Sequence, residues 1–175
     1  MCIRDRARTA RKLNAKVIVD TSGPALKAVL QEGVYLIKPN LREFRELTGT
    51  RSVDDAALIE ASRSLIDKGL VELIALTLGS DGALLIARDS ALRADGLPIK
   101  PVSVVGAGDS FVGAMTWSLA NGNSLDLAFR FGVAAGSAAL LNPGTELCKF
   151  EDVRRLAAQV TVRPVVGADG SGRID

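Results

Sequence analysis

Short runs of aliphatic, often β-branched residues alternate with helix-like segments along most of this chain, and this alternation most constrains its fold. Residues 15–23, 34–40 and 71–79 each hold a compact apolar run that ends in turn-forming residues, a pattern typical of buried parallel strands. The segments between these runs place apolar residues at helical intervals. The sequence therefore predicts an α/β fold with a mostly parallel sheet.

The remaining segments extend the same pattern. Residues 82–88 follow a turn and are expected to form the hairpin partner of the third strand, and a polar stretch with Pro98 and Pro101 comes next. Ser52 and Asp55 have the spacing of a capping box, which predicts a helix start there. Further helices are expected over residues 109–119, 124–141 and 150–160.

Three regions are expected along the chain. Residues 1–14 are a basic segment of doubtful origin or the end of a helix, and the first six resemble sequence from a cloning adaptor. Residues 15–162 form the main globular part. Residues 163–175 are rich in Gly and Asp, and we expect a disordered tail there.

Composition excludes several classes of function. The chain has no histidine, which rules out Ser-His-Asp triads, Cys-His nucleophiles and His-ligated zinc within it. Its two cysteines are too few for a disulfide scaffold, and a net charge of +2 lacks the basic bias of nucleic-acid-binding proteins. No apolar stretch approaches the roughly 20 residues of a membrane span. We therefore expect a cytoplasmic protein with no nucleic-acid or membrane partner.

Residues 103–114 read SVVGAGDSFVGA and form the most distinctive segment. Gly106 and Gly108 flank Ala107, so backbone amides there can approach a ligand closely. A helix that begins at about Asp109 would add the positive end of its dipole, which favours an anion. Asp109 is then a candidate base beside a phosphate cradle, or only an N-cap after a turn. Spacing alone leaves both readings open.

Two other polar segments also follow predicted strands, and ligands of parallel sheets bind at that edge. Asn40 and Glu43 lie three residues apart at a helix start, where they could hold Mg²⁺ or merely cap the helix. Lys38 is a candidate phosphate contact or an ordinary surface lysine. Thr77, with the glycines that follow it, has the pattern of a turn.

The segment SVVGAGDSFVGAM resembles the C-terminal signature of the PfkB (ribokinase-like) sugar kinases, with Val105 where the family usually has Thr. The later segment FGVAAGSAALLNPGTELC makes the chain most similar to the PfkB-type 6-phosphofructokinases. The resemblance runs from about residue 15 to 160 but covers only the C-terminal portion of the family domain. It implies an incomplete ribokinase-like fold of three α/β/α layers.

The resemblance also implies a role for each matching residue. Asp109 is the expected catalytic base, and the amides of Gly106, Ala107 and Gly108 form the anion hole. Asn40 and Glu43 are expected to organise Mg²⁺, directly or through water. The expected ATP contacts are Lys38, Asn40, Thr77, Gly79, Ser80, Asp81, Gly82, Val133 and Ser137. A potassium ion bound by some family members would take carbonyls of Ser103, Val105, Ala139, Asn142 and Gly144.

The function implied is ATP-dependent phosphorylation of a sugar phosphate, fructose 6-phosphate to fructose 1,6-bisphosphate, by a protein that is a homodimer at full length. The alternatives within this class are 1-phosphofructokinase and tagatose-6-phosphate kinase. A nucleotide-binding fragment without catalytic activity is a third reading. A nicotinamide-dependent oxidoreductase is disfavoured, because the first strand is followed by VDTSGPA and not by a Gly-x-Gly-x-x-Gly fingerprint.

Overall fold

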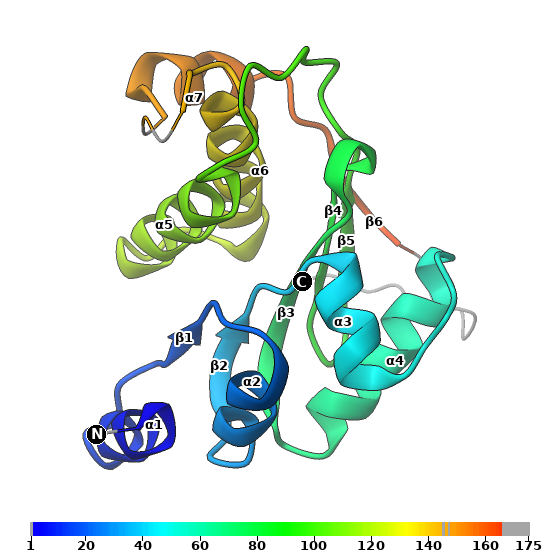
Figure 1. The fold of residues 1–175 in the computed structure, drawn as a ribbon, viewed down its shortest axis with the longest axis vertical. Helices are drawn as coiled ribbons and strands as arrows, with labels where there is room; N and C mark the ends of the chain where they lie inside the picture. Colours follow the sequence, from blue (N-terminus) through cyan, green and yellow to red (C-terminus); the bar gives the residue numbers. More distant parts are fainter. Residues whose placement is uncertain (1, 145, 147, 166–175) are drawn as a thin grey trace. The chain divides into compact units, whose positions relative to one another are not determined.

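The computed structural model describes residues 2–144, 146 and 148–165. The chain divides into two compact units. The first takes Met1–Leu78, Leu84–Ala91 and Pro164–Asp175, and the second takes Gly79–Ala83 and Leu92–Arg163. Figure 1 shows the elements of each unit.

The strands form a sheet that is parallel where the first three pair. The described strands are β1 (Ile18–Val19), β2 (Val34–Ile37), β3 (Val71–Thr77), β4 (Ala83–Ile86), β5 (Ala91–Ala94) and β6 (Val162–Pro164). They follow this same order across the sheet. β1 pairs with β2 and β2 with β3, both in parallel, side by side in Figure 1. β4 lies next to β3 in the sheet. The connection between them is too short for a parallel crossover, which agrees with the prediction that residues 82–88 form a hairpin with the third strand.

The described residues of the first unit also form four helices: α1 (Ile3–Lys12), α2 (Gly23–Leu30), α3 (Leu41–Thr48) and α4 (Asp55–Asp67). Pro24 lies in the first turn of α2, where its missing N–H costs no hydrogen bond. α3 ends at Gly49, whose φ of 79° is left-handed. Fully buried Ile37, Ile74 and Leu76 contribute to the core.

The predicted start of α4 is wrong by two residues. Asp54, not Ser52, is the N-cap, and its carboxylate accepts a hydrogen bond from the Ala57 amide at 3.3 Å. The Ser52 hydroxyl instead accepts from the Asp54 amide at 3.0 Å. Both side chains satisfy backbone amides, and the carboxylate nearer the helix takes the capping position.

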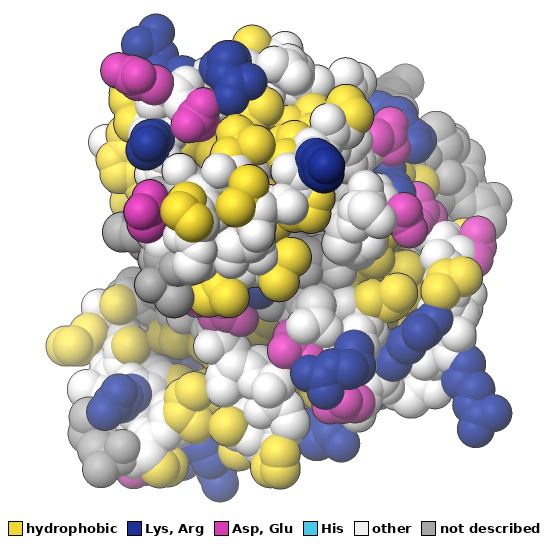
Figure 2. Space-filling model, turned by 45° about the horizontal axis from the view of Figure 1, so that its top comes forward, with side chains coloured by type: hydrophobic (Ala, Val, Ile, Leu, Met, Phe, Trp, Pro, Cys, Tyr) yellow, Lys and Arg dark blue, Asp and Glu magenta, His cyan; other side chains and the backbone are white. Residues whose placement is uncertain are grey.

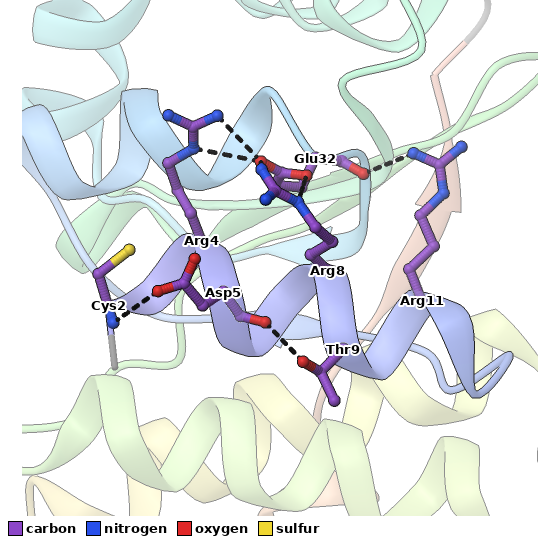
Figure 3. Close-up of polar contacts among 7 residues, drawn as sticks. All are labelled: Cys2, Arg4, Asp5, Arg8, Thr9, Arg11 and Glu32. Atoms are coloured by element: carbon purple, nitrogen blue, oxygen red, sulfur yellow. Dashed lines mark hydrogen bonds and ion pairs between the residues drawn. The ribbon is translucent and has the colours of Figure 1, made fainter.

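Helix α1 lies within residues 1–14, where the end of a helix was one of the two expectations, and its basic side chains bind a single acidic residue. Figure 3 shows Arg4 and Arg8 reaching from α1 to the carboxylate of Glu32, at 3.1 and 2.8 Å. Arg11 also donates to the Glu32 backbone carbonyl at 2.9 Å. Three arginines of α1 therefore bind Glu32, just after the end of α2.

The second unit is mainly helical, with η1 (Gly79–Asp81), α5 (Ala107–Ala120), α6 (Leu125–Ala139) and α7 (Phe150–Ala157). α5 packs on α6 at glycines: a Cβ on Gly136 would lie 3.2 Å from the Ala107 carbonyl oxygen, and one on Gly132 would lie 3.2 Å from the Phe111 ring. The Phe111 and Phe129 rings meet edge to face, 6.3 Å apart. The small residues of α6 thus permit close contact between these helices.

Two strands, β5 and β6, were not predicted. β6 includes Arg163 and Pro164, the first two residues of the predicted tail, so the tail boundary is wrong there. Residues 166–175 of that predicted tail lie outside the described residues.

Within the described part of the chain, no helix has the length and apolarity needed to cross a membrane. The face drawn in Figure 2 intersperses hydrophobic side chains with basic and acidic ones.

Candidate functional site

The ends of β2 and β3 meet in the first unit. Asn40 and Thr77 form a parallel bridge, and the Thr77 amide donates to the Pro39 carbonyl oxygen at 3.0 Å. The Thr77 hydroxyl lies 3.5 Å from the same oxygen. Two of the polar segments expected at the strand ends, those around Asn40 and Thr77, are therefore brought together.

Lys38, at the end of β2, is not a surface lysine. Only 7% of the residue is exposed, and its Nζ lies 3.4 Å from Asp20 Oδ2. Asp20 follows β1, beside Lys38, and the Lys38 amide donates to the Val19 carbonyl at 3.3 Å. Sequence reasoning missed Asp20, although an acidic residue directly after the run VIV was a usable signal.

Asn40 and Glu43 form a reciprocal capping box at the start of α3. Asn40 Oδ1 accepts from the Glu43 amide at 2.9 Å, and Glu43 Oε2 accepts from the Asn40 amide at 3.0 Å. The capping reading of this pair is therefore correct. It does not exclude the metal reading, because each side chain keeps unused lone pairs, including those of Glu43 Oε1.

Glu43 also lines a cleft between α2 and α3. The cleft has a volume of about 420 Å³. Its described lining residues are Gly23, Pro24, Leu26, Lys27, Glu43, Glu46 and Leu47. The cleft therefore lies beside α3, and Glu43 is one of the residues that line it.

The turn after β3 belongs to the second unit. Its expected nucleotide contacts Gly79, Ser80 and Asp81 form η1 and are exposed. Gly82 has a φ of +96°, and a Cβ there would overlap the Ala94 carbonyl oxygen. Packing thus requires a glycine at position 82 whether or not a nucleotide binds.

The glycine-rich segment starts α5 two residues earlier than expected. Gly106 is the N-cap, with a left-handed φ of 79°, so Asp109 is the third residue of the helix and the N-cap reading of it is wrong. Asp109 is exposed and has no hydrogen-bond or ion-pair partner among the described residues. The Ser110 hydroxyl beside it is buried and likewise has no hydrogen-bond partner in the described part of the chain. A free carboxylate therefore lies in the first turn of α5, where the amides of Gly106, Ala107 and Gly108 also lie.

The segments proposed for potassium are joined by hydrogen bonds. The Ser103 hydroxyl donates to the Gly144 carbonyl at 2.9 Å and accepts from the Val105 amide at 3.2 Å. Asn142 is buried just after the end of α6, and its backbone amide donates to the Ala139 carbonyl oxygen at 3.2 Å. These carbonyls each retain a lone pair after such contacts.

The two residues expected to contact adenine lie one turn apart on α6. Val133 is buried, with 6% of its surface exposed, and Ser137 is partly exposed. The residues expected to form one site are thus divided between the units. Lys38, Asn40, Glu43 and Thr77 belong to the first unit, and the remainder belong to the second.

Comparisons with known proteins identify the family. The family model described as "pfkB family carbohydrate kinase" matches residues 2–152. The chain is 42% identical over 154 residues to ATP-dependent 6-phosphofructokinase isozyme 2 of Mycobacterium tuberculosis (strain H37Rv), covering 86% of this chain and 45% of that protein. It is 40% identical over 153 residues to the Escherichia coli K12 isozyme 2, covering 87% and 50%. A 1-phosphofructokinase of Borreliella burgdorferi is 37% identical over 153 residues, covering 87% and 49%.

Solved structures show the fold. The crystal structure of phosphofructokinase-2 from Escherichia coli in complex with potassium matches with a TM-score of 0.84 at 39% identity, covering 89% of this chain and 51% of that one. A ribokinase of Arabidopsis thaliana with ribose and ATP gives a TM-score of 0.77 at 25% identity, covering 86% and 50%. The ribokinase-like fold is thus confirmed, and the chain spans about half the length of these relatives. The chain belongs to the pfkB family of carbohydrate kinases.

Proposed function

We propose that this chain carries the ATP site and the catalytic base of an ATP-dependent sugar-phosphate kinase that converts fructose 6-phosphate to fructose 1,6-bisphosphate. The observation that carries the proposal is Asp109, an exposed carboxylate in the first turn of α5 that neither caps the helix nor pairs with another described residue. Similarity to the two 6-phosphofructokinases supports the substrate.

In the proposed reaction, Asp109 accepts the proton of the sugar hydroxyl. The hydroxyl oxygen bonds to the γ-phosphorus as the bond between that phosphorus and the β,γ-bridging oxygen breaks, and ADP leaves with the electron pair. The amides of Gly106, Ala107 and Gly108, with the positive end of α5, stabilise the charge on the transferred group.

The residues of the first unit fit a bound Mg²⁺. Oxygen donors are the ligands that Mg²⁺ prefers, and Glu43 Oε1 is free of the capping box that engages Oε2. Mg²⁺ held at Glu43 and Asn40, directly or through water, would neutralise phosphate charge. Lys38, Thr77 and η1 would contact the nucleotide, with Val133 and Ser137 beside the adenine.

Potassium is a further part of the proposal. One relative's crystal structure is a potassium complex, and the Ser103–Gly144 hydrogen bond brings two of the expected carbonyl segments together. Ser103, Val105, Ala139, Asn142 and Gly144 would supply the oxygens. A homodimeric, cytoplasmic enzyme remains our expectation for the whole protein; one form of the Escherichia coli relative is tetrameric.

A second candidate is 1-phosphofructokinase activity, which the Borreliella burgdorferi relative favours. Both reactions would use the same base and anion hole. Two further alternatives are tagatose-6-phosphate kinase activity and nucleotide binding without phosphoryl transfer.

The test is a chimera in which this chain replaces the matching half of the Escherichia coli isozyme 2. We expect MgATP-dependent phosphorylation of fructose 6-phosphate. Asp109→Asn should lower kcat by about 10²- to 10⁴-fold, the usual contribution of a general base, while the Kd for ATP stays nearly unchanged. Asp126→Asn is the matched control, because Asp126 is also in the first turn of a helix, α6, but pairs with Arg130 at 3.6 Å.

Equal loss of ATP affinity and turnover in Asp109→Asn would show that Asp109 is structural. Binding of ATP without any transfer by the chimera would favour the non-catalytic alternative.

A further inference from the structure

Asp20, which forms an ion pair with Lys38, has no role in the reaction described so far. Lys38 is buried, with only 7% of its residue surface exposed. Asp20 is more accessible, since 30% of its side chain is exposed. A buried ammonium needs a negative partner, because its lost hydration is costly. Asp20 supplies that charge from the end of the neighbouring strand.

We propose that Asp20 is a positioning residue that acts as a temporary counter-ion: it holds the Lys38 ammonium in place in the nucleotide-free protein and releases it to a nucleotide phosphate. This inference rests on the proposed nucleotide site. The ligand chemistry is a polyphosphate, and adenine contacts are not required for the exchange.

The geometry of this ion pair suits a Lys38 side chain that moves from Asp20 to a phosphate better than a Lys38 side chain fixed permanently on Asp20. The 3.4 Å separation of Nζ and Oδ2 exceeds the roughly 2.7–2.9 Å of a strong charge-assisted hydrogen bond. An ammonium on a flexible stem can turn from a carboxylate to a phosphate oxygen. Lys38 also directly precedes Pro39 and Asn40, which meet Thr77 at the strand ends.

Asp20 therefore has two opposed effects on phosphate binding. It keeps Lys38 in position, but it also competes with the phosphate for the ammonium and repels negative charge nearby. Replacing its charge with an amide of the same shape removes the competition while a polar partner remains. Phosphate binding should then become tighter, at the expense of the stability of the ligand-free protein.

The test is titration calorimetry of tripolyphosphate and of MgATP with this 175-residue chain. Asp20→Asn should bind both ligands about fivefold more tightly than wild type, the scale of a partly exposed ion pair. Asp20→Glu restores the charge and should return the Kd to within about twofold of wild type. Asp67→Asn is the matched control, since Asp67 forms an exposed pair with Arg88 at 3.3 Å elsewhere in the first unit; it should leave both Kd values unchanged.

A Lys38→Met background separates the exchange from general electrostatics. Lys38→Met should weaken binding, and adding Asp20→Asn to it should give no fivefold gain, because the competed ammonium is gone. An equal gain in both backgrounds would overturn the exchange.

The remaining outcomes are also decisive. Unchanged or weaker binding by folded Asp20→Asn, with wild type binding normally, overturns the exchange but leaves the proposed function standing. If Asp20→Asn unfolds alone, tripolyphosphate must restore its circular dichroism, and failure to do so overturns the exchange. Wild type that binds neither ligand overturns the nucleotide site and the exchange together.

Discussion

At Glu32 one carboxylate faces two guanidinium groups, and this arrangement makes a pH-dependent contribution to the stability of the first unit. The hydrogen bond from Arg8, followed by that from Arg4, lowers the pKa of Glu32 from 4.5 to about 2, although burial opposes the shift. A carboxylate with a lowered folded pKa stabilises the fold above its unfolded pKa. This stabilisation is complete above about pH 4.5 and is lost as the pH falls toward 2.

We therefore expect Glu32→Gln to lower the urea midpoint at pH 7 and to have little effect at pH 2. The measurement is urea unfolding of both chains across this pH range. Glu46→Gln is the control, because Glu46 forms only an exposed helical pair with Arg42, a kind of pair that contributes little to stability. A Glu32→Gln effect independent of pH would contradict the ion-pair account.

Single residues show where sequence reasoning succeeds and where it stops. The capping box of Asn40 and Glu43 could be predicted because capping depends on local spacing alone. The pairing of Asp20 with Lys38 could not, because it depends on which strands become neighbours. The position of the α4 cap was not predicted correctly, because neighbouring polar residues each satisfy a different backbone amide: Ser52 accepts from the Asp54 amide, and Asp54 accepts from the Ala57 amide and caps the helix.

Between α5 and α6, the spacing of the helices depends on Gly132 and Gly136. Gly136 and Gly113 make a matched pair: a Cβ on Gly136 would meet the Ala107 carbonyl oxygen at 3.2 Å, and one on Gly113 would meet nothing within 4 Å. Alanine is favoured over glycine in a helix interior by about 0.5–1 kcal/mol. Gly113→Ala should therefore stabilise the chain by about that amount.

Gly136→Ala should be at least about 1 kcal/mol less favourable than Gly113→Ala, because its added methyl crowds a backbone atom that cannot rotate away. The measurement is urea unfolding followed by the fluorescence of Trp117, the only tryptophan of the sequence, which lies on α5. Equal stabilisation by the two alanines would show that the helices separate at no cost.

The long helices were predictable because their apolar residues repeat over several turns, as in α4, α5 and α6. The short strands β5 and β6 were not, since four and three residues cannot display a period. β5 carries Arg93, whose guanidinium donates to the Ala83 and Ala94 carbonyls. A charged residue in such a short segment looks like a loop residue until its backbone partners are known.

For the whole molecule, the comparisons match this chain to about half of each phosphofructokinase. We expect sugar specificity to follow the other half, because the proposed chemistry of this chain is common to both reactions. A chimera with the complementary half of the Borreliella burgdorferi 1-phosphofructokinase should prefer fructose 1-phosphate. The chimera with the Escherichia coli half should prefer fructose 6-phosphate.

The ratio of kcat/KM for the two sugar phosphates measures this preference. Asp109→Asn should lower turnover in both chimeras, which tests whether one base serves both reactions. A preference that stays constant as the donor half changes would place specificity within this chain.

For the whole molecule, the fold could be predicted from the resemblance to the family, because several family motifs occur in a fixed order along the chain. The division into two units could not be predicted, since it depends on contacts between segments distant in sequence. The proposed site residues fall in both units for the same reason.

The course of the chain between these units also limits how the protein can be dissected. Residues 79–83 belong to the second unit, residues 84–91 return to the first, and Pro164 begins a further return. No single cut can release either unit whole: ending a gene fragment at Leu78 would leave the first unit without Leu84–Ala91. Exchange of one unit between relatives would need several coordinated crossovers, so we expect recombination to preserve this stretch of chain as one block.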